Sequence, residues 1–328
     1  MIGRFLLTII GLGIALSAQA QPQLRTLNVI VFPGGFNLPT WAAERQGFFE
    51  QNGVRVALTA TPNSTFQMQG LAEGRFDIAM TAIDNVVAYQ EGQGEAKIPD
   101  NPDMFAFMGS DNGFLSVLGG KGVKSFADLK GKKLSVDAMT TGFAFVLREL
   151  LAKNGIAESE VTFERAGGVV QRYQELMKGT HAATVVLTPF DLLGEAQGHV
   201  QLARADEHLG AYLGVVGASR RSWARQNEQA LVGFIRAYRA GVVFLYENPD
   251  IAEALLVANV RAMTPALAKR SLGVLLGEKT GFFRDVRLDP QGAATVLALR
   301  SKYSEARRPL TDAGKYMDGS YRDKALAR

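Results

Sequence analysis

Cysteine is absent from all 328 residues, and this absence excludes several chemistries at once. No disulfide framework can hold the chain, no thiolate can act as a nucleophile, and no cysteine near the N-terminus can take a lipid. We therefore expect the fold to be held by apolar cores, which a chain of this length easily buries.

Histidine and clustered charge are also scarce. The formal net charge is only +4, and Lys and Arg are scattered rather than gathered in runs, so nucleic acid is not an expected partner. The three histidines, His181, His199 and His208, lack metal-ligand spacing, and no Gly-x-Ser-x-Gly or phosphate-loop pattern occurs. We expect no metal, no cofactor, no catalytic residues and no enzymatic activity.

The first twenty residues are typical of a cleavable signal peptide. Arg4 precedes an apolar run over residues 5–16, and Ala18-Gln19-Ala20 forms a small-residue cleavage pattern. The apolar run is too short for a comfortable bilayer span of about 20 residues. We expect cleavage before Gln21 and an exported mature chain without a membrane anchor.

Strand and helix patterns alternate along the mature chain. A β-branched run over residues 26–32 ends at a Pro-Gly-Gly turn, helical spacing over residues 39–51 stops at Asn-Gly, and a second strand follows over residues 54–60. The same alternation continues through strands predicted at 76–80, 133–137, 161–165, 182–187 and 212–217. The pattern predicts an α/β fold with mostly parallel sheets covered by helices on both faces.

The order of these elements indicates two lobes. We expect lobe I to comprise residues 24–112 and 218–328, the latter almost wholly helical, and lobe II to comprise residues 113–217. Because the second lobe is an insertion, two chain segments must join the lobes, near Gly113-Phe114 and near Leu213-Gly214. Two doubly wound lobes joined by a two-segment hinge are therefore predicted.

Three motifs resemble one family of transport proteins. The segments are Thr40-Trp-Ala-Ala-Glu-Arg-Gln-Gly-Phe-Phe49 with Gly53-Val-Arg-Val56, Gly70-Leu-Ala-Glu-Gly-Arg-Phe-Asp-Ile-Ala79, and Asp128-Leu-Lys-Gly-Lys-Lys-Leu134. In this order they resemble the NMT1/THI5-like binding proteins of ABC importers, whose ligands include nitrate, sulfonates, taurine and thiamine-precursor pyrimidines. The resemblance implies a type II periplasmic-binding-protein fold, a periplasmic location, a monomer, and permease and ATPase subunits as partners.

Loops that follow the strands are expected to line a pocket between the lobes, as in other open α/β sheets. Some of these residues fit a local role equally well, since Asn63, Ser64 and Asp84 also suit helix N-caps, and the loop from Gly34 to Asn37 also suits a plain turn. The predicted ligand-binding residues are Phe36, Asn37, Asn63, Ser64, Thr81, Asp84, Asn85, Phe114, Asp137, Thr140, Thr141, Gly142, Gly168 and Thr188.

The ligand class is predicted from two loops. Thr140 and Thr141 open a helix whose free amides suit a carboxylate or sulfonate, whereas Asp84 would accept hydrogen bonds from an amine or pyrimidine. The chain departs from many family members by having Ala182-Ala183 and Leu187-Thr188 where they carry an acid and an aromatic-acid pair, which favours a ligand with an apolar body. We predict capture of a small organic anion, a sulfonate or an aromatic or aliphatic carboxylate, by lobe closure. The alternatives are an amine-bearing or pyrimidine solute, a cofactor-independent enzyme of the same fold, and a sensor.

Overall fold

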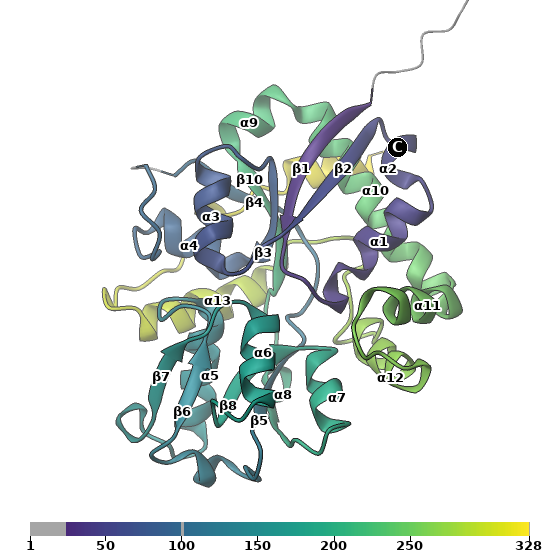
Figure 1. Ribbon diagram of the computed structural model, residues 1–328. Coiled ribbons are helices and arrows are strands. Elements are labelled where there is room, and N and C mark those ends of the chain that lie inside the picture. Colours follow the sequence, from purple (N-terminus) through teal and green to yellow (C-terminus); the bar gives the residue numbers. More distant parts are fainter. Residues whose placement is uncertain (1–23, 100–101, 328) are drawn as a thin grey trace, which may run out of the picture.

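The computed structural model describes residues 24–99 and 102–327, and it contains two five-stranded sheets, each flanked by helices (Figure 1). The predicted signal peptide, residues 1–20, lies outside the described residues. We call the part of the chain built around the first sheet lobe I and the part built around the second sheet lobe II.

The sheet of lobe I has the strand order β2-β1-β3-β10-β4. β1 pairs in parallel with β2 and β3, whereas β10 runs antiparallel to both of its neighbours. The central strands β3 and β10 are buried on both faces along almost their whole length, as expected for a sheet covered by helices on both sides. The strands are β1 (Arg25–Val31), β2 (Val54–Ala60), β3 (Ile78–Ala82), β4 (Met104–Gly109) and β10 (Val215–Arg220).

The sheet of lobe II repeats this plan, with the order β7-β6-β8-β5-β9. β6 pairs in parallel with β7 and β8, and β5 runs antiparallel to β8 and β9. The strands are β5 (Leu115–Gly119), β6 (Lys133–Val136), β7 (Thr162–Arg165), β8 (Ala183–Leu187) and β9 (Gln201–Arg204).

In each sheet the antiparallel strand is the one that the chain enters directly after crossing from the other lobe. The two crossings lie side by side at Asp111, whose buried Oδ1 accepts hydrogen bonds from the amides of Gly113 at 2.9 Å and Val215 at 3.2 Å. Gly113 has a φ of 96°, a left-handed conformation that favours glycine. One carboxylate thus ties both segments of the hinge.

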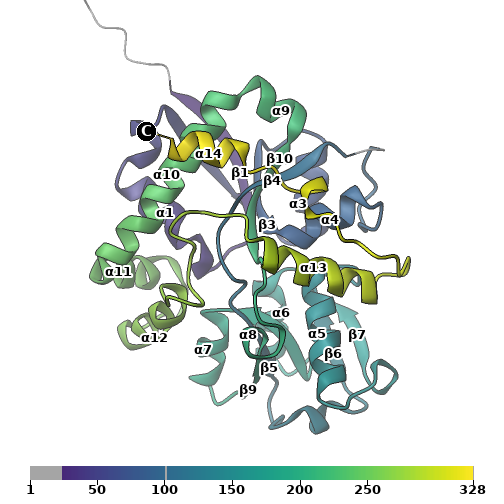
Figure 2. The same cartoon turned by 180° about the vertical axis from the view of Figure 1, so that it is seen from behind.

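The helices cover both sheets and fill the seam between the lobes. Figure 2 shows α13 lying between the two lobes on the side opposite to that seen in Figure 1. Lobe I carries α1 (Leu38–Arg45), α2 (Phe48–Gln51), α3 (Ser64–Ala72) and α4 (Ile83–Gln90), and lobe II carries α5 (Gly142–Lys153), α6 (Val169–Met177), α7 (Phe190–Glu195) and α8 (Ala205–Leu209). The C-terminal part is α9 (Arg221–Gln226), α10 (Glu228–Glu247), α11 (Pro249–Asn259), α12 (Pro265–Leu275), α13 (Pro290–Tyr303) and α14 (Ser320–Leu326).

The predicted alternation of strands and helices is confirmed, with local differences. The helix expected over residues 39–51 is split into α1 and α2 at Gly47, which has a φ of 70°. The short elements α7 and β9 were not predicted. Residues 212–214 belong to the second crossing rather than to a strand, and residues 215–217 pair with β3 and β4 in lobe I. We therefore propose that the second lobe ends near residue 214, three residues before the predicted boundary.

Within residues 24–99 and 102–327, no helix combines the length and the apolarity that a membrane crossing requires.

Candidate functional site

A cavity lies between the lobes, where the carboxyl ends of strands from both sheets face each other. Its volume is about 40 Å³, measured as the space open to the centre of a water molecule. One water needs roughly 10–15 Å³ on this measure, so the cavity has room for about three waters. Lobe I contributes Phe32, Phe36, Met80, Thr81, Ala82, Asn85 and Val215, and lobe II contributes Asp137, Thr141, Gly142, Phe143, Val169, Arg172 and Leu187.

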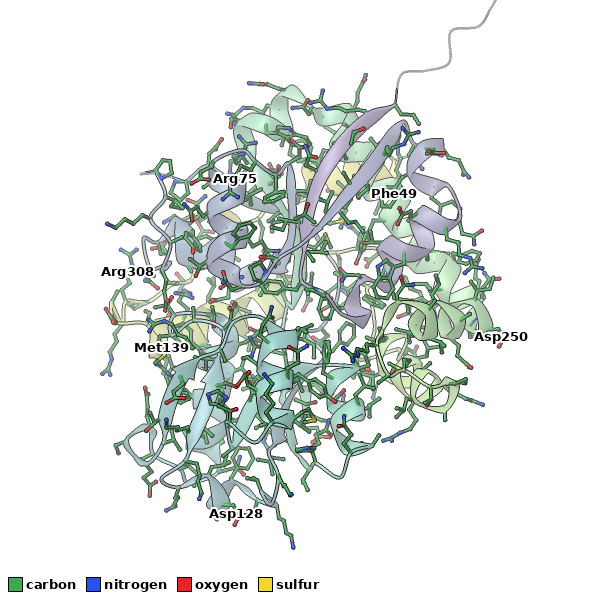
Figure 3. All side chains as sticks on the ribbon, viewed as in Figure 1. Phe49, Arg75, Asp128, Met139, Asp250 and Arg308 are labelled. Carbon is green, nitrogen blue, oxygen red and sulfur yellow. The ribbon has the colours of Figure 1, made fainter. Side chains whose placement is uncertain are left out.

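Direct contacts between the lobes surround this cavity. The amide of Ser64 donates to Asp137 Oδ2 at 3.0 Å, and the amide of Gly168 donates to the Pro62 carbonyl at 2.8 Å. The amide of Met139, which Figure 3 places at the edge of lobe II beside the seam, donates to Glu95 Oε1 at 2.7 Å. The structure therefore presents the lobes in a closed arrangement.

Most of the cavity wall is apolar. Phe32, Phe36 and Met80 of lobe I face Phe143, Val169 and Leu187 of lobe II across the seam. Burying apolar surface stabilises by about 25 cal/mol per Å². This wall therefore suits a solute with a hydrocarbon or aromatic body.

Among the described residues that line the cavity, Arg172 is the one cation, and sequence reasoning missed it. It lies on α6 with only 3% of its surface exposed, and it donates to the carbonyls of Gly167 at 2.8 Å and Val185 at 3.1 Å. Within the described part of the chain it forms no ion pair with a carboxylate. Burial lowers the pKa of its guanidinium from the usual value, and the negative charge of Asp137 acts in the opposite direction.

The position of Arg172 did leave a signal in the sequence. Val169, Arg172 and Leu176 are all buried on one face of α6, at the spacing of an apolar helical stripe. A charged residue on such a stripe is seldom buried without a partner. An arginine in this register, directly after a strand-to-helix loop, therefore indicates a functional cation.

Asp137 supplies the opposite charge in the same cavity. Its Oδ2 is held by the Ser64 amide, whereas its buried Oδ1 has no hydrogen-bond partner among the described residues. An unpartnered buried acceptor costs about 1–3 kcal/mol, and more when it is charged. The site thus combines two charged side chains. Arg172 donates to two backbone carbonyls, and Asp137 has one oxygen that accepts from the Ser64 amide and one without a partner among the described residues.

Two helices of lobe II begin at the cavity without side-chain caps. α5 begins after Thr141, whose hydroxyl donates to the Ala138 carbonyl at 3.0 Å rather than capping the helix, and α6 begins after Gly168. The amides of a first helical turn have no partner within the helix, and they carry partial positive charge. These helix ends add to the positive field of Arg172.

The structure brings six of the fourteen predicted site residues to the cavity wall: Phe36, Thr81, Asn85, Asp137, Thr141 and Gly142. Three others contact the opposite lobe beside it. Ser64 and Gly168 donate amide hydrogen bonds across the seam, and the Thr140 carbonyl accepts from Arg300 at 2.6 Å.

The remaining predicted residues have local roles in this arrangement. Asn37 donates to the carbonyls of Phe32 and Gly34, and Asn63 caps α3 by accepting from the Phe66 amide at 2.7 Å. Phe114 lies in the first crossing, with its ring centroid 5.2 Å from that of Phe282, and Thr188 donates to Asp191 at 3.0 Å. Their contact with a ligand stays a prediction.

Asp84 has neither of the two roles predicted for it, which were to cap a helix N-terminus or to accept a hydrogen bond from a ligand. The N-cap of α4 is Ala82, so the capping interpretation is wrong. Both carboxylate oxygens accept from Arg300 of α13, Oδ1 from Nε at 2.7 Å and Oδ2 from Nη2 at 2.5 Å, and both side chains are almost fully buried. In the closed arrangement Asp84 is therefore committed to an ion pair, and Asp137 is the carboxylate that lines the cavity.

Solved structures with the same architecture define the class of fold. The periplasmic nitrate-binding protein NrtA from Synechocystis PCC 6803 superposes with a TM-score of 0.74 at 16% identity, covering 93% of this chain and 89% of that one. The alkanesulfonate-binding protein SsuA from Xanthomonas axonopodis pv. citri, bound to MOPS, gives a TM-score of 0.71 at 16% identity, covering 91% of this chain and all of that one. The predicted type II periplasmic-binding-protein fold is confirmed.

The family follows from the sequence match. Residues 37–252 match the family described as NMT1/THI5 like, and the chain belongs to this family, as its motifs predicted. A curated relative, 4-amino-5-hydroxymethyl-2-methylpyrimidine phosphate synthase from Uromyces fabae, is 23% identical over 65% of this chain. The chain spans 64% of the length of that relative.

Proposed function

We propose that this protein is the periplasmic solute-binding component of an ABC importer and that it captures a small organic anion with an apolar body. Arg172 carries this proposal. A buried guanidinium without a carboxylate pair is costly, and an anionic solute would supply the missing charge. The uncapped ends of α5 and α6 act in the same direction, and the apolar wall accommodates the rest of the solute.

The mechanism is closure of the lobes around the solute. An open state admits the anion, the walls from both lobes then contact it, and the closed state is the form that the permease recognises. A solute shifts this equilibrium only by binding the closed form better than the open form. Because the cavity in the closed arrangement is small, the solute is a small acid, and an acid as large as a single ring requires the two walls to lie slightly further apart than they do here.

The test compares acids with their neutral amides. Mature protein beginning at Gln21 is titrated calorimetrically with benzoate, benzenesulfonate and butanesulfonate, and with benzamide, benzenesulfonamide and butanesulfonamide. At least one acid should bind about tenfold or more tightly than its amide, since a hydrogen bond between charged partners contributes about 1.5–3 kcal/mol.

Variants of α6 assign this preference to one residue. Arg172→Gln should abolish the preference for the acid, and Arg172→Lys should retain part of it. Lys178→Gln removes an exposed positive charge from the end of the same helix and should leave the preference unchanged. If no acid binds better than its amide, or if Arg172→Gln binds acids as well as the unmodified protein does, the proposal is wrong.

A second candidate is a solute that donates hydrogen bonds, such as an amine or an aminopyrimidine. The free Oδ1 of Asp137 supports it, because an N–H group would satisfy that oxygen. Under this alternative 4-amino-2-methylpyrimidine binds more tightly than any of the acids. Recovery of the solute unchanged after prolonged incubation, measured by mass spectrometry, separates binding from turnover.

A further inference from the structure

We infer that Arg300 is a positioning residue of the solute site: it fixes the loop that opens α5 in lobe II against α4 in lobe I when the lobes close. This inference rests on the proposed function for its meaning, since it concerns the wall of the same cavity. It assigns a role to the C-terminal helix α13, which contributes no residue to that wall.

The contacts of Arg300 reach both lobes from one guanidinium. Nε and Nη2 donate to the two oxygens of Asp84 on α4, and Nη1 donates to Gln93 Oε1 at 2.7 Å, directly beyond the end of α4. Nη2 also donates to the Thr140 carbonyl of lobe II at 2.6 Å. The guanidinium carbon lies 4.9 Å from the centroid of the Phe145 ring on α5.

The residues that Arg300 contacts are adjacent in sequence to residues that line the cavity. Thr140 is followed by Thr141 and Gly142, which line the cavity, and Asp84 is followed by Asn85, which lines it from the other lobe. The side chain of Arg300 is fully buried, so water cannot replace its hydrogen-bond partners while the lobes stay closed. Opening the seam must break either the hydrogen bond to Thr140 or the pair with Asp84.

The pair is more durable than the carbonyl contact. Two charge-assisted hydrogen bonds to a carboxylate are stronger than one hydrogen bond to a neutral carbonyl, and the planar fork of arginine matches a carboxylate geometrically. Asp84 therefore holds Arg300 in place, and Thr140 is the contact made on closing and lost on opening. In this way Arg300 presents a fixed docking point for the loop from Thr140 to Gly142.

The experiment measures closure without any solute. Because the chain has no cysteine, Ala57→Cys in lobe I and Ala127→Cys in lobe II, both at exposed positions, can be spin-labelled uniquely, and the distance between the labels measured by electron resonance. The doubly labelled protein that keeps Arg300 should show a population with a short distance between the labels. The doubly labelled Arg300→Gln variant should lose this population. Calorimetry with the tightest-binding probe among benzoate, benzenesulfonate and butanesulfonate should show an apparent affinity reduced roughly tenfold or more, because the apparent dissociation constant scales inversely with the competent fraction.

Matched variants separate positioning from a general loss of stability. Lys302→Gln breaks an exposed pair between the same helices, α13 and α5, and should change neither readout, as expected for a surface ion pair. Arg300→Lys keeps the charge without the fork and should restore part of the closed population. If Arg300→Gln fails to fold, the double variant Asp84→Asn with Arg300→Gln removes the buried unpaired charge and allows the same measurement.

The outcomes distinguish this inference from the proposed function. The role of Arg300 is overturned, whatever the solute is, if the folded parent protein and the folded variants that lack the arginine show identical distance distributions. Failure of all three acids to bind the parent protein overturns the anion proposal, and it leaves the solute-free distance measurement intact.

Discussion

Gly142, the first residue of α5, lies directly against Asp84 of the opposite lobe. A Cβ built on Gly142 would come 2.5 Å from the Asp84 Cβ and 2.6 Å from its Cγ. Gly142 does not have a positive φ, so it is the space across the seam, and not backbone freedom, that requires glycine here. Packing this tight exists only while the lobes are closed.

Gly142→Ala is therefore expected to prevent closure without harming either lobe. In the open state the added methyl group meets nothing from lobe I, and alanine is preferred over glycine in helices by up to about 1 kcal/mol. We expect an unchanged or higher melting temperature for the solute-free protein, together with a solute affinity weakened about tenfold or more. Differential scanning calorimetry and titration with the acid probes measure the two effects.

Gly273→Ala is the control for this variant. Gly273 lies within α12, and a Cβ there would have no neighbour within 4 Å in the part of the chain that the structure describes, so the change should leave affinity unaltered. Unchanged affinity in Gly142→Ala would mean that solute is bound in a different arrangement of the lobes.

Asp137→Asn is expected to change the preference between solutes. The asparagine oxygen can still accept from the Ser64 amide, while its NH₂ group replaces the free Oδ1. Removing a negative charge beside the cavity should strengthen binding of benzoate, and converting an acceptor to a donor should weaken binding of 4-amino-2-methylpyrimidine. The ratio of the two affinities, measured by parallel titrations, should move by about tenfold or more toward the acid. A ratio that does not move would show that Asp137 faces neither solute.

Much of the fold was predictable because its signals are local. β-Branched runs such as Val54–Ala60 and helix stops such as Asn52-Gly53 need only neighbouring residues to be interpreted, and they placed most strands within a few residues. The loops after these strands then gave Thr81, Asn85 and Asp137 as cavity residues.

The partners of the charged residues were not predictable in the same way. Asp84 and Arg300 lie 216 positions apart, so nothing in the local sequence of Asp84 distinguishes a carboxylate held by an arginine from one that is free for a ligand. Arg172 lay on a helix and not in a strand-to-helix loop, so reasoning from loops alone passed over it. Tertiary packing decides the partner of Asp84 and has no counterpart in single-sequence patterns, whereas the helical spacing of Val169, Arg172 and Leu176 was a signal that reasoning from loops did not use.

The final prediction concerns the hinge. Burial raises the pKa of Asp111 from 3.8 to about 6, against the hydrogen bonds from the Val215 and Gly113 amides, which lower it. Between about pH 4 and pH 6 the folded protein therefore keeps a proton that the unfolded chain has released. Stability from this group is present below pH 4 and is lost as the pH rises through 6.

Asp111→Asn lacks this titration, and its amide oxygen can still accept from both backbone amides of the hinge. The free energy of unfolding of Asp111→Asn, relative to the parent protein, should increase from pH 4 to pH 7 by on the order of 3 kcal/mol. Urea unfolding at several pH values measures it. Asp250→Asn, at the exposed site labelled in Figure 3, is the control and should stay within about 0.5 kcal/mol of the parent throughout. A difference between Asp111→Asn and the parent that is the same at every pH would show that folding does not raise the pKa of Asp111.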